Sequence, residues 1–344
     1  MDLDEFTYRL PERLIAQEPC PERDGSRMMI VRRKAGSIDL SNFQALPGHL
    51  KKGDVLVIND SKVIPARLYG RKDTGGVIEI LLLSRQDFYD DAIWEVLLKP
   101  AKRVQIGTTV NFGPGSRAHL IKRLAERKWL LRFETALPFE RFLEEYGGIP
   151  LPPYIKRSET KKIVSDDRER YQTLYARVPG SVAAPTAGLH FSDDLLGRLK
   201  NQNIPMVSVT LHIGYGTFMP ITVKKVEDHV MDEEFYEVTP EAAEAINGAR
   251  RVIAVGTTST RVIEAAAEKD GKVRPGSGQT SLFIYPGFQF RRVGAMLTNF
   301  HLPRSSLFLL VCAFAGTELM HSAYRRAVEE EFRFYSYGDC MLIL

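Results

Sequence analysis

Three histidines stand where an imidazole could serve as an acid or a base. His190 ends a loop of small residues just before a helix N-cap, His212 lies near the carboxyl end of a predicted strand, and His301 interrupts an apolar background. Imidazole titrates near pH 7, so it can donate or accept a proton during catalysis. Ligands of open α/β sheets bind beyond the carboxyl ends of strands, which favours His212 and Thr217 as site residues. The alternative is that each is an ordinary polar residue.

A second chemical feature is the run of small hydroxyl residues after the predicted strand 251–256. A helix expected to begin near Ser259 would present free backbone N–H groups and the positive end of its dipole, which favour a carboxylate or phosphate. Thr257, Thr258 and Ser259 would add hydroxyl donors, and Arg261 would add a positive charge. The alternative is plain N-capping by serine and threonine.

Alternating strands and helices are predicted around these motifs. Strands are expected at 55–60, 205–213 and 251–256, and helices at 192–203, 239–250 and 258–269. Ser192 and Thr239 are the expected N-caps of the first two helices. Such alternation favours a layered α/β domain with a largely parallel sheet.

The stretch from residue 68 to 154 has a different pattern. Short predicted strands at 75–83, 92–99, 109–112 and 128–134 are separated by turns, and a short helix and a Pro-rich connector follow. This spacing is typical of a small β-barrel or sandwich. We therefore expect a discontinuous large α/β domain, residues 1–67 and 155–344, with a small β-barrel domain, residues 68–154, inserted into it.

The formal net charge of +4 conceals a strongly basic segment. From Lys99 to Arg132 the chain has nine Lys or Arg residues and one acid, Glu126, a local charge of +8. A solvated face is one interpretation and a polyanion-binding surface is the other. Strand alternation must turn some of these side chains away from a shared surface. The residues expected to contact phosphates are Lys102, Arg103, Lys122, Arg123 and Lys128.

Several classes of protein are disfavoured by what the sequence lacks. Three scattered cysteines form neither a metal-like spacing nor a disulfide framework, so we expect no metal and a reducing, cytoplasmic location. No apolar run approaches the ~18 residues of a membrane span, and the first residues do not resemble a signal peptide. The motifs of dinucleotide binding, nucleotide hydrolysis and serine hydrolysis are missing.

Ten segments occur in the order, and near the spacing, of one enzyme family. They are RLPERLIAQEPCPERDGSRMMIV, GDVLVINDSKVIPARL, WEVLLKPAKR, GIPLPPYIKR, ERYQTLYARVPGSVAAPTAGLHF, VTLHIGYGTF, GTTSTRVIE, TSLFIYPGFQF, LTNFHLPRSSLFLLVCAFAG and FRFYSYGDCMLIL. Together they resemble the S-adenosylmethionine:tRNA ribosyltransferase-isomerase family over essentially the whole chain. The resemblance also implies a large α/β domain with a β-barrel insertion.

The resemblance implies a reaction in queuosine biosynthesis. The ribosyl part of S-adenosylmethionine moves to an aminomethyl-deazaguanine base at the tRNA wobble position and is isomerised to an epoxycyclopentanediol, while adenine and methionine leave. S-adenosylmethionine would be a co-substrate and tRNA the partner of a monomeric enzyme that needs no membrane.

That chemistry asks for at least two groups that titrate near neutrality. A base must remove a proton beside the sulfonium, and the departing adenine needs a proton or a hydrogen bond. The catalytic candidates are His190, His212 and His301, with Asp60 as a carboxylate alternative. The helix start at 257–261 suits the methionine carboxylate, and Arg170 and Tyr171 are candidates for contacts with the ribose or the base.

Three positions depart from the family pattern. Ser61-Lys62 stands where Thr-Arg is common, Asp232 stands where a histidine usually follows Met231, and Cys340 replaces a small residue and is expected to pack in the interior.

Two other functions remain open. One is a non-catalytic RNA-binding protein, against which the loops far from the basic segment argue. The other is an S-adenosylmethionine-dependent RNA methyltransferase, against which the missing Gly-rich loop argues.

Overall fold

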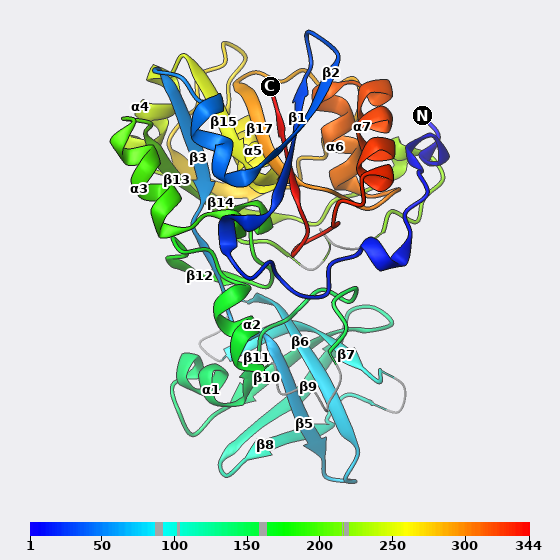
Figure 1. Ribbon diagram of the computed structural model, residues 1–344. Helices are drawn as coiled ribbons and strands as arrows, with labels where there is room; N and C mark the ends of the chain where they lie inside the picture. The colour runs from blue at the N-terminus through cyan, green and yellow to red at the C-terminus, as the bar shows by residue number, and fades with distance from the viewer. Residues whose placement is uncertain (87–91, 102–103, 158–163, 215, 217–219) are drawn as a thin grey trace.

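The computed structural model describes residues 1–86, 92–101, 104–157, 164–214, 216 and 220–344. A large part with helices on both sides of a sheet lies above a smaller β-barrel in Figure 1. The expected fold class, a layered α/β domain with an inserted β-barrel, is confirmed.

Nine strands of the described residues form the large sheet. Their order across it is β16 (Gly276–Thr280), β14 (Glu234–Val238), β13 (Met206–Leu211), β3 (Asp54–Asn59), β15 (Arg251–Val255), β17 (Val293–Asn299), β18 (Cys340–Ile343), β1 (Arg27–Arg32) and β2 (Ser37–Asn42). The central strands β13, β3, β15 and β17 are parallel to one another, and β18 is parallel to β1. The other pairs of the sheet are antiparallel, so the expectation of a largely parallel sheet holds for the centre and only in part for the flanks. The expectation rested on the pattern of apolar residues, which indicates which residues of a strand are buried but not whether its neighbours are parallel or antiparallel.

Alternate residues of the central strands enter two cores. Val55 and Val57 of β3 face the core formed with α4 to α7, whereas Leu56 and Ile58 face the core formed with α3 and two 3-10 helices. The helices are α1 (Phe139–Tyr146), α2 (Val164–Arg170), α3 (Asp193–Asn201), α4 (Pro240–Gly248), α5 (Gly256–Ala266), α6 (Ser306–Ala315) and α7 (Thr317–Glu329). The 3-10 helices are η1 (Leu3–Phe6), η2 (Glu12–Leu14), η3 (Arg23–Gly25), η4 (Phe43–His49), η5 (Thr186–His190) and η7 (Val226–Asp228). Ser192 and Thr239 cap α3 and α4, as predicted.

The barrel has a core of its own and closes through a pairing of β5 with β8. Its sheet order is β11 (Gly147–Gly148), β5 (Arg67–Lys72), β6 (Val77–Arg85), β7 (Ala92–Lys99), β10 (Lys128–Glu134), β9 (Ser116–Arg123) and β8 (Thr109–Gly113).

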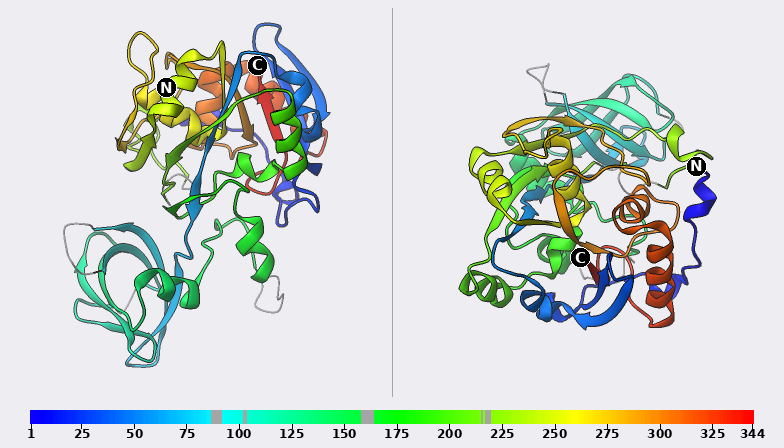
Figure 2. Two further views of the ribbon diagram at one scale, coloured as in Figure 1. Left: turned by 90° about the vertical axis from the view of Figure 1, so that its left-hand side faces the viewer. Right: turned by 90° about the horizontal axis from the view of Figure 1, so that it is seen from above.

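A two-stranded sheet lies where the chain passes between the two parts. It pairs β4 (Ser61–Val63), which continues from β3 toward the barrel, with β12 (Val178–Ser181), which follows the return passage. Figure 2 shows the barrel suspended from the large part at this narrow connection.

Of the helices in the described ranges, none alone is long and apolar enough to cross a membrane; α6 and α7 meet the criterion only as a pair bent by 117°.

Candidate active site

The predicted motifs converge at one edge of the large sheet. The four central parallel strands end at Asn59, Leu211, Val255 and Asn299, and parallel strands present their carboxyl ends at the same edge. The passage to the barrel starts at this edge, because β4 follows β3 there (Figure 1). Residues far apart in the sequence therefore meet between the sheet and the barrel.

A pocket opens at this edge. It is lined by segments 184–187, 256–258, 298–302 and 335–336, together with Tyr154, Ile213, Ser305 and Leu307. Of the predicted site residues, the pocket brings together Thr257, Thr258 and His301.

Helix α5 starts in the pocket wall without a side-chain cap. It begins at Gly256, three residues before the predicted start at Ser259. Gly256 adopts a φ of +92°, which glycine tolerates, so the chain turns from β15 into α5 with no residue between them. Ser259 is not the cap, since its hydroxyl donates to the carbonyl of Val255 at 2.9 Å. The hydroxyl of Thr258 is buried and has no hydrogen-bond partner among the described residues. The helix start therefore offers unused donors to the pocket.

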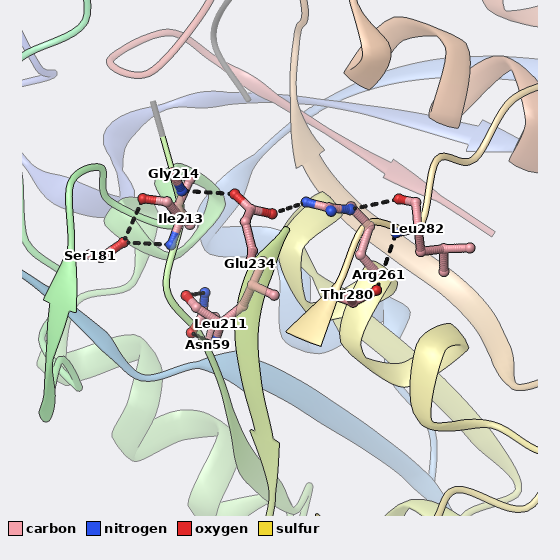
Figure 3. A network of polar contacts seen from close by, with 9 residues as sticks. All are labelled: Asn59, Ser181, Leu211, Ile213, Gly214, Glu234, Arg261, Thr280 and Leu282. Carbon is pink, nitrogen blue, oxygen red and sulfur yellow. Dashed lines mark hydrogen bonds and ion pairs between the residues drawn. The ribbon is translucent and has the colours of Figure 1, made fainter. Parts of the chain in front are cut away.

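Arg261 does not bring its charge to the pocket. It forms an ion pair with Glu234, both side chains are about 97% buried, and its Nε donates to the carbonyl of Leu282 at 3.0 Å. The other oxygen of Glu234 accepts from the backbone N–H of Gly214 at 2.8 Å. Figure 3 shows this chain of contacts, which joins α5 to the loop after β13.

His301 lies in the pocket wall. Its Nε2 is 2.8 Å from the hydroxyl of Thr298, and its backbone N–H donates to the hydroxyl of Tyr324 at 3.0 Å. Burial lowers the pKa of His301 to about 3, so the imidazole is neutral at pH 7.

His190 lies behind the pocket rather than in its wall. Its Nδ1 is 3.0 Å from the hydroxyl of Ser26. Burial lowers the pKa of His190 to about 4, against a smaller opposing effect of Asn299. Neither His190 nor His301 therefore titrates near neutrality, in contrast to the expectation.

His212 and Asp60 belong to a polar cluster beside the pocket. The buried carboxylate of Asp60 accepts from the hydroxyl of Thr210 at 2.7 Å and from Arg177 at 2.8 Å. The ring of His212 stacks on Phe235, and its Nδ1 is 3.2 Å from the hydroxyl of Ser61. Burial lowers the pKa of His212, and the charge of Asp60 opposes this shift.

Arg170 and Tyr171 do not reach the pocket wall. The guanidinium of Arg170 donates to the carbonyls of Cys20 and Pro21. Tyr171 is fully buried against Tyr337, and burial raises the pKa of its phenol. Thr217 lies outside the described residues.

The predicted phosphate contacts are only partly described, since Lys102 and Arg103 lie outside the described residues. Lys128 pairs with Glu95, and Arg123 donates to the carbonyls of Ala125 and Glu126. Lys122 is exposed on β9 and has no ion pair among the described residues. The local charge is thus partly neutralised within the barrel.

The pocket residues that are absent from the predicted site include Tyr154, Asn299, Tyr335 and Ser336. The rings of Tyr154 and Tyr335 lie 4.0 Å apart, and the hydroxyls of Tyr154 and Ser336 lie 2.6 Å apart. Asn299 could have been found because it is a polar residue that interrupts the same apolar background as His301. Tyr335 has a φ of +74°, a conformation that no local sequence pattern predicts, so its place in the pocket wall could not be found from the sequence.

Two of the departures from the family pattern have a clear setting. Cys340 is fully buried in β18, as expected. Asp232 is exposed, and its carboxylate packs so closely on Gly216 that a Cβ there would lie 2.2 Å from Oδ2.

Comparison with known proteins gives full-length matches. A model described as "Queuosine biosynthesis protein" matches residues 3–343. The chain is 56% identical to the S-adenosylmethionine:tRNA ribosyltransferase-isomerase of Syntrophus aciditrophicus and 49% identical to that of Desulforamulus reducens, in both cases over all of each chain. It is also similar to a crystal structure of S-adenosylmethionine tRNA ribosyltransferase from Thermotoga maritima, with 36% identity, a TM-score of 0.56, and coverage of 99% of this chain and 100% of that chain. The chain belongs to the queuosine biosynthesis protein family.

Proposed function

We propose that this protein is an S-adenosylmethionine:tRNA ribosyltransferase-isomerase. It transfers the ribosyl moiety of S-adenosylmethionine to the aminomethyl-deazaguanine base at the tRNA wobble position and isomerises it, which gives epoxyqueuosine-tRNA, adenine and methionine. The full-length relationship to relatives of that name carries this proposal.

The start of α5 suits the carboxylate of the methionyl end of S-adenosylmethionine. The uncapped backbone N–H groups of residues 256–258 and the unpaired hydroxyl of Thr258 are donors at the positive end of the helix. Ser259 and Arg261 support this start from behind, through Val255 and Glu234.

The electrostatics of the pocket suit a cationic co-substrate. His301 and His190 are neutral at pH 7, and the charge of Arg261 is paired with Glu234, so none of them repels a sulfonium. We assign His301 as the base because it is the histidine of the described pocket wall and is unprotonated at pH 7, although its lowered pKa departs from the near-neutral value expected of that group.

The cluster of His212 and Asp60 is the candidate for the second proton transfer. Its position beside the passage to the barrel would place it on the tRNA side of the pocket. Arg170 and Tyr171 act indirectly in this proposal, by holding the segments behind the pocket.

The tRNA would dock on the barrel and reach the pocket past β4 and β12. We assign residues 68–154 to docking and residues 1–67 and 155–344 to catalysis, in a monomeric cytoplasmic enzyme that needs no metal. Of the predicted phosphate contacts among the described residues, Lys122 is exposed and is not engaged by an ion pair or hydrogen bond, so we assign a phosphate contact to it.

One incubation tests the function. With S-adenosylmethionine and precursor tRNA, the protein should release adenine and methionine in equal amounts. Release of S-adenosylhomocysteine would instead indicate a methyltransferase, and tRNA binding without any product would indicate a binding protein.

A further inference from the structure

The amide of Asn299 is anchored on one side only. Its Nδ2 donates to the carbonyl of Tyr335 at 2.8 Å and to that of Ser336 at 3.4 Å. Two carbonyl neighbours require the nitrogen at this position, so the Oδ1 atom is the one that remains. Asn299 is 2% exposed and lines the pocket, yet its Oδ1 accepts no hydrogen bond among the described residues. A buried, unpaired acceptor in a pocket wall indicates a ligand that donates.

His190 stands behind this amide. Helix η5, which ends at His190, packs against β17, which ends at Asn299. The hydroxyl of Ser26 holds the ring at Nδ1, and Nε2 is buried without a well-aligned hydrogen bond among the described residues. A side-chain hydrogen bond with Asn299 opposes the lowering of the His190 pKa, so the imidazole of His190 faces the amide of Asn299 and can engage one of the two lone pairs of Oδ1, which leaves the other for a ligand.

The acceptor and the donors of α5 face the same pocket. Thr258 Oγ1 and the start of α5 favour an anion, whereas Asn299 Oδ1 favours a hydrogen-bond donor. The described residues of the pocket wall include no Lys, Arg, Asp or Glu, so no positive side chain there repels a cationic ligand. An α-amino acid carries both complementary groups, a carboxylate and an ammonium, on one carbon atom.

We propose that Asn299 Oδ1 accepts a hydrogen bond from the α-ammonium group of the methionyl end of S-adenosylmethionine, and that His190 is a positioning residue for this amide. The assignment rests on the proposed function and adds to it the orientation of the co-substrate, with its amino-acid end between α5 and β17.

Ligands that lack one of the two groups provide the test. Inhibition constants against S-adenosylmethionine are measured in the adenine-release assay for methionine, for 4-(methylthio)butanoate, which lacks the amine, and for 3-(methylthio)propylamine, which lacks the carboxylate. The wild-type protein should prefer methionine at least tenfold over both. Asn299→Ala should lose the preference over the butanoate and keep the preference over the amine.

Thr258→Val is the matched control, with the opposite pattern expected. Thr258→Val should lose the preference for methionine over 3-(methylthio)propylamine, which lacks the carboxylate, and keep the preference over 4-(methylthio)butanoate, which lacks the amine. His190→Ala leaves the anchors of Asn299 in place and should weaken ammonium preference severalfold, while His190→Gln, which retains a donor, should restore part of it. The pH profile of kcat should be unchanged in His190→Gln, which separates positioning from proton transfer.

Clear results would overturn the inference. Retention of the preference for methionine over the butanoate in both Asn299→Ala and His190→Ala would do so. A selective loss of inhibition by adenine in Asn299→Ala would also do so, because it would assign Oδ1 to the purine. If the wild-type protein released no adenine, the proposed function would fail; calorimetric binding of methionine and the butanoate would still test the amino-acid site.

Discussion

The carboxylate of Glu234 lies between the guanidinium of Arg261 and the backbone N–H of Gly214. One side chain thus ties the helix that begins in the pocket to the loop that follows β13 (Figure 3). Arg261→Met should lower the free energy of unfolding by about 3–5 kcal/mol, because it leaves a buried carboxylate without its counter-charge. Urea unfolding at pH 7 measures this loss.

Arg274→Met is the control for that prediction. Arg274 pairs with Glu268 on the surface, where its side chain is 71% exposed, so its replacement should cost less than about 1 kcal/mol. Equal losses for the two variants would contradict the importance of the buried pair.

Thr258→Val should raise the KM for S-adenosylmethionine about tenfold and change kcat little. The substitution keeps the shape and removes one hydrogen bond to a charged group, worth roughly 1.5 kcal/mol. Steady-state adenine release measures both constants.

Ser259→Ala is the comparison for Thr258. Its hydroxyl is bonded inside the helix, so the KM should stay within about twofold of wild type. A similar rise in KM for the two variants would mean that the effect comes from the helix and not from a contact with the ligand.

The start of α5 shows how far the sequence could predict this site. The hydroxyl run after a buried strand correctly indicated donors at a helix start, but the helix begins at Gly256 and only two of the predicted contacts line the pocket. The partner of Arg261 lies 27 residues away on β14, and a contact between distant strands and helices leaves no local pattern. Lys128 is a parallel case, because Glu95 faces it from β7.

Acidification should destabilise the protein through His190 and His301. Their pKa values are about 4 and about 3 in the folded protein, so below an unfolded value of about 6.5 the unfolded chain binds protons that the folded protein does not. This contribution to stability is therefore complete above pH 6.5 and is lost as the pH falls toward 4 for His190 and toward 3 for His301. Each histidine should cost about 1.5 kcal/mol between pH 6.5 and 5.

Urea unfolding at those two pH values gives the loss directly. His301→Gln should show a smaller fall than wild type by about 1.5 kcal/mol, since glutamine does not titrate. An unchanged fall would show that His301 is protonated in the folded protein as readily as in the unfolded chain.

Lys122→Glu should weaken binding of precursor tRNA and reduce the salt dependence of binding by about one to two counterions. Lys122 is exposed on the barrel, whereas Lys128 and Arg123 are already engaged. Filter binding over a range of salt concentrations gives both quantities.

Lys52→Glu is the matched charge reversal. Lys52 is exposed in the turn before β3, at the opposite edge of the sheet from the pocket, and its reversal should leave the salt slope unchanged. Equal effects of the two variants would point to total charge rather than to a docking surface on the barrel.

The in-register pairing of Arg67 with Gly148 has an evolutionary consequence. Residues opposite each other in antiparallel strands lie about 5 Å apart, the separation that a two-residue hairpin turn closes. The barrel thus occupies the place of a single tight turn, and a chain joined at these two residues would keep the connectivity of the α/β part. Recognition of a large polynucleotide and chemistry on a small sulfonium compound can on this geometry have separate ancestries, joined by one insertion into a loop.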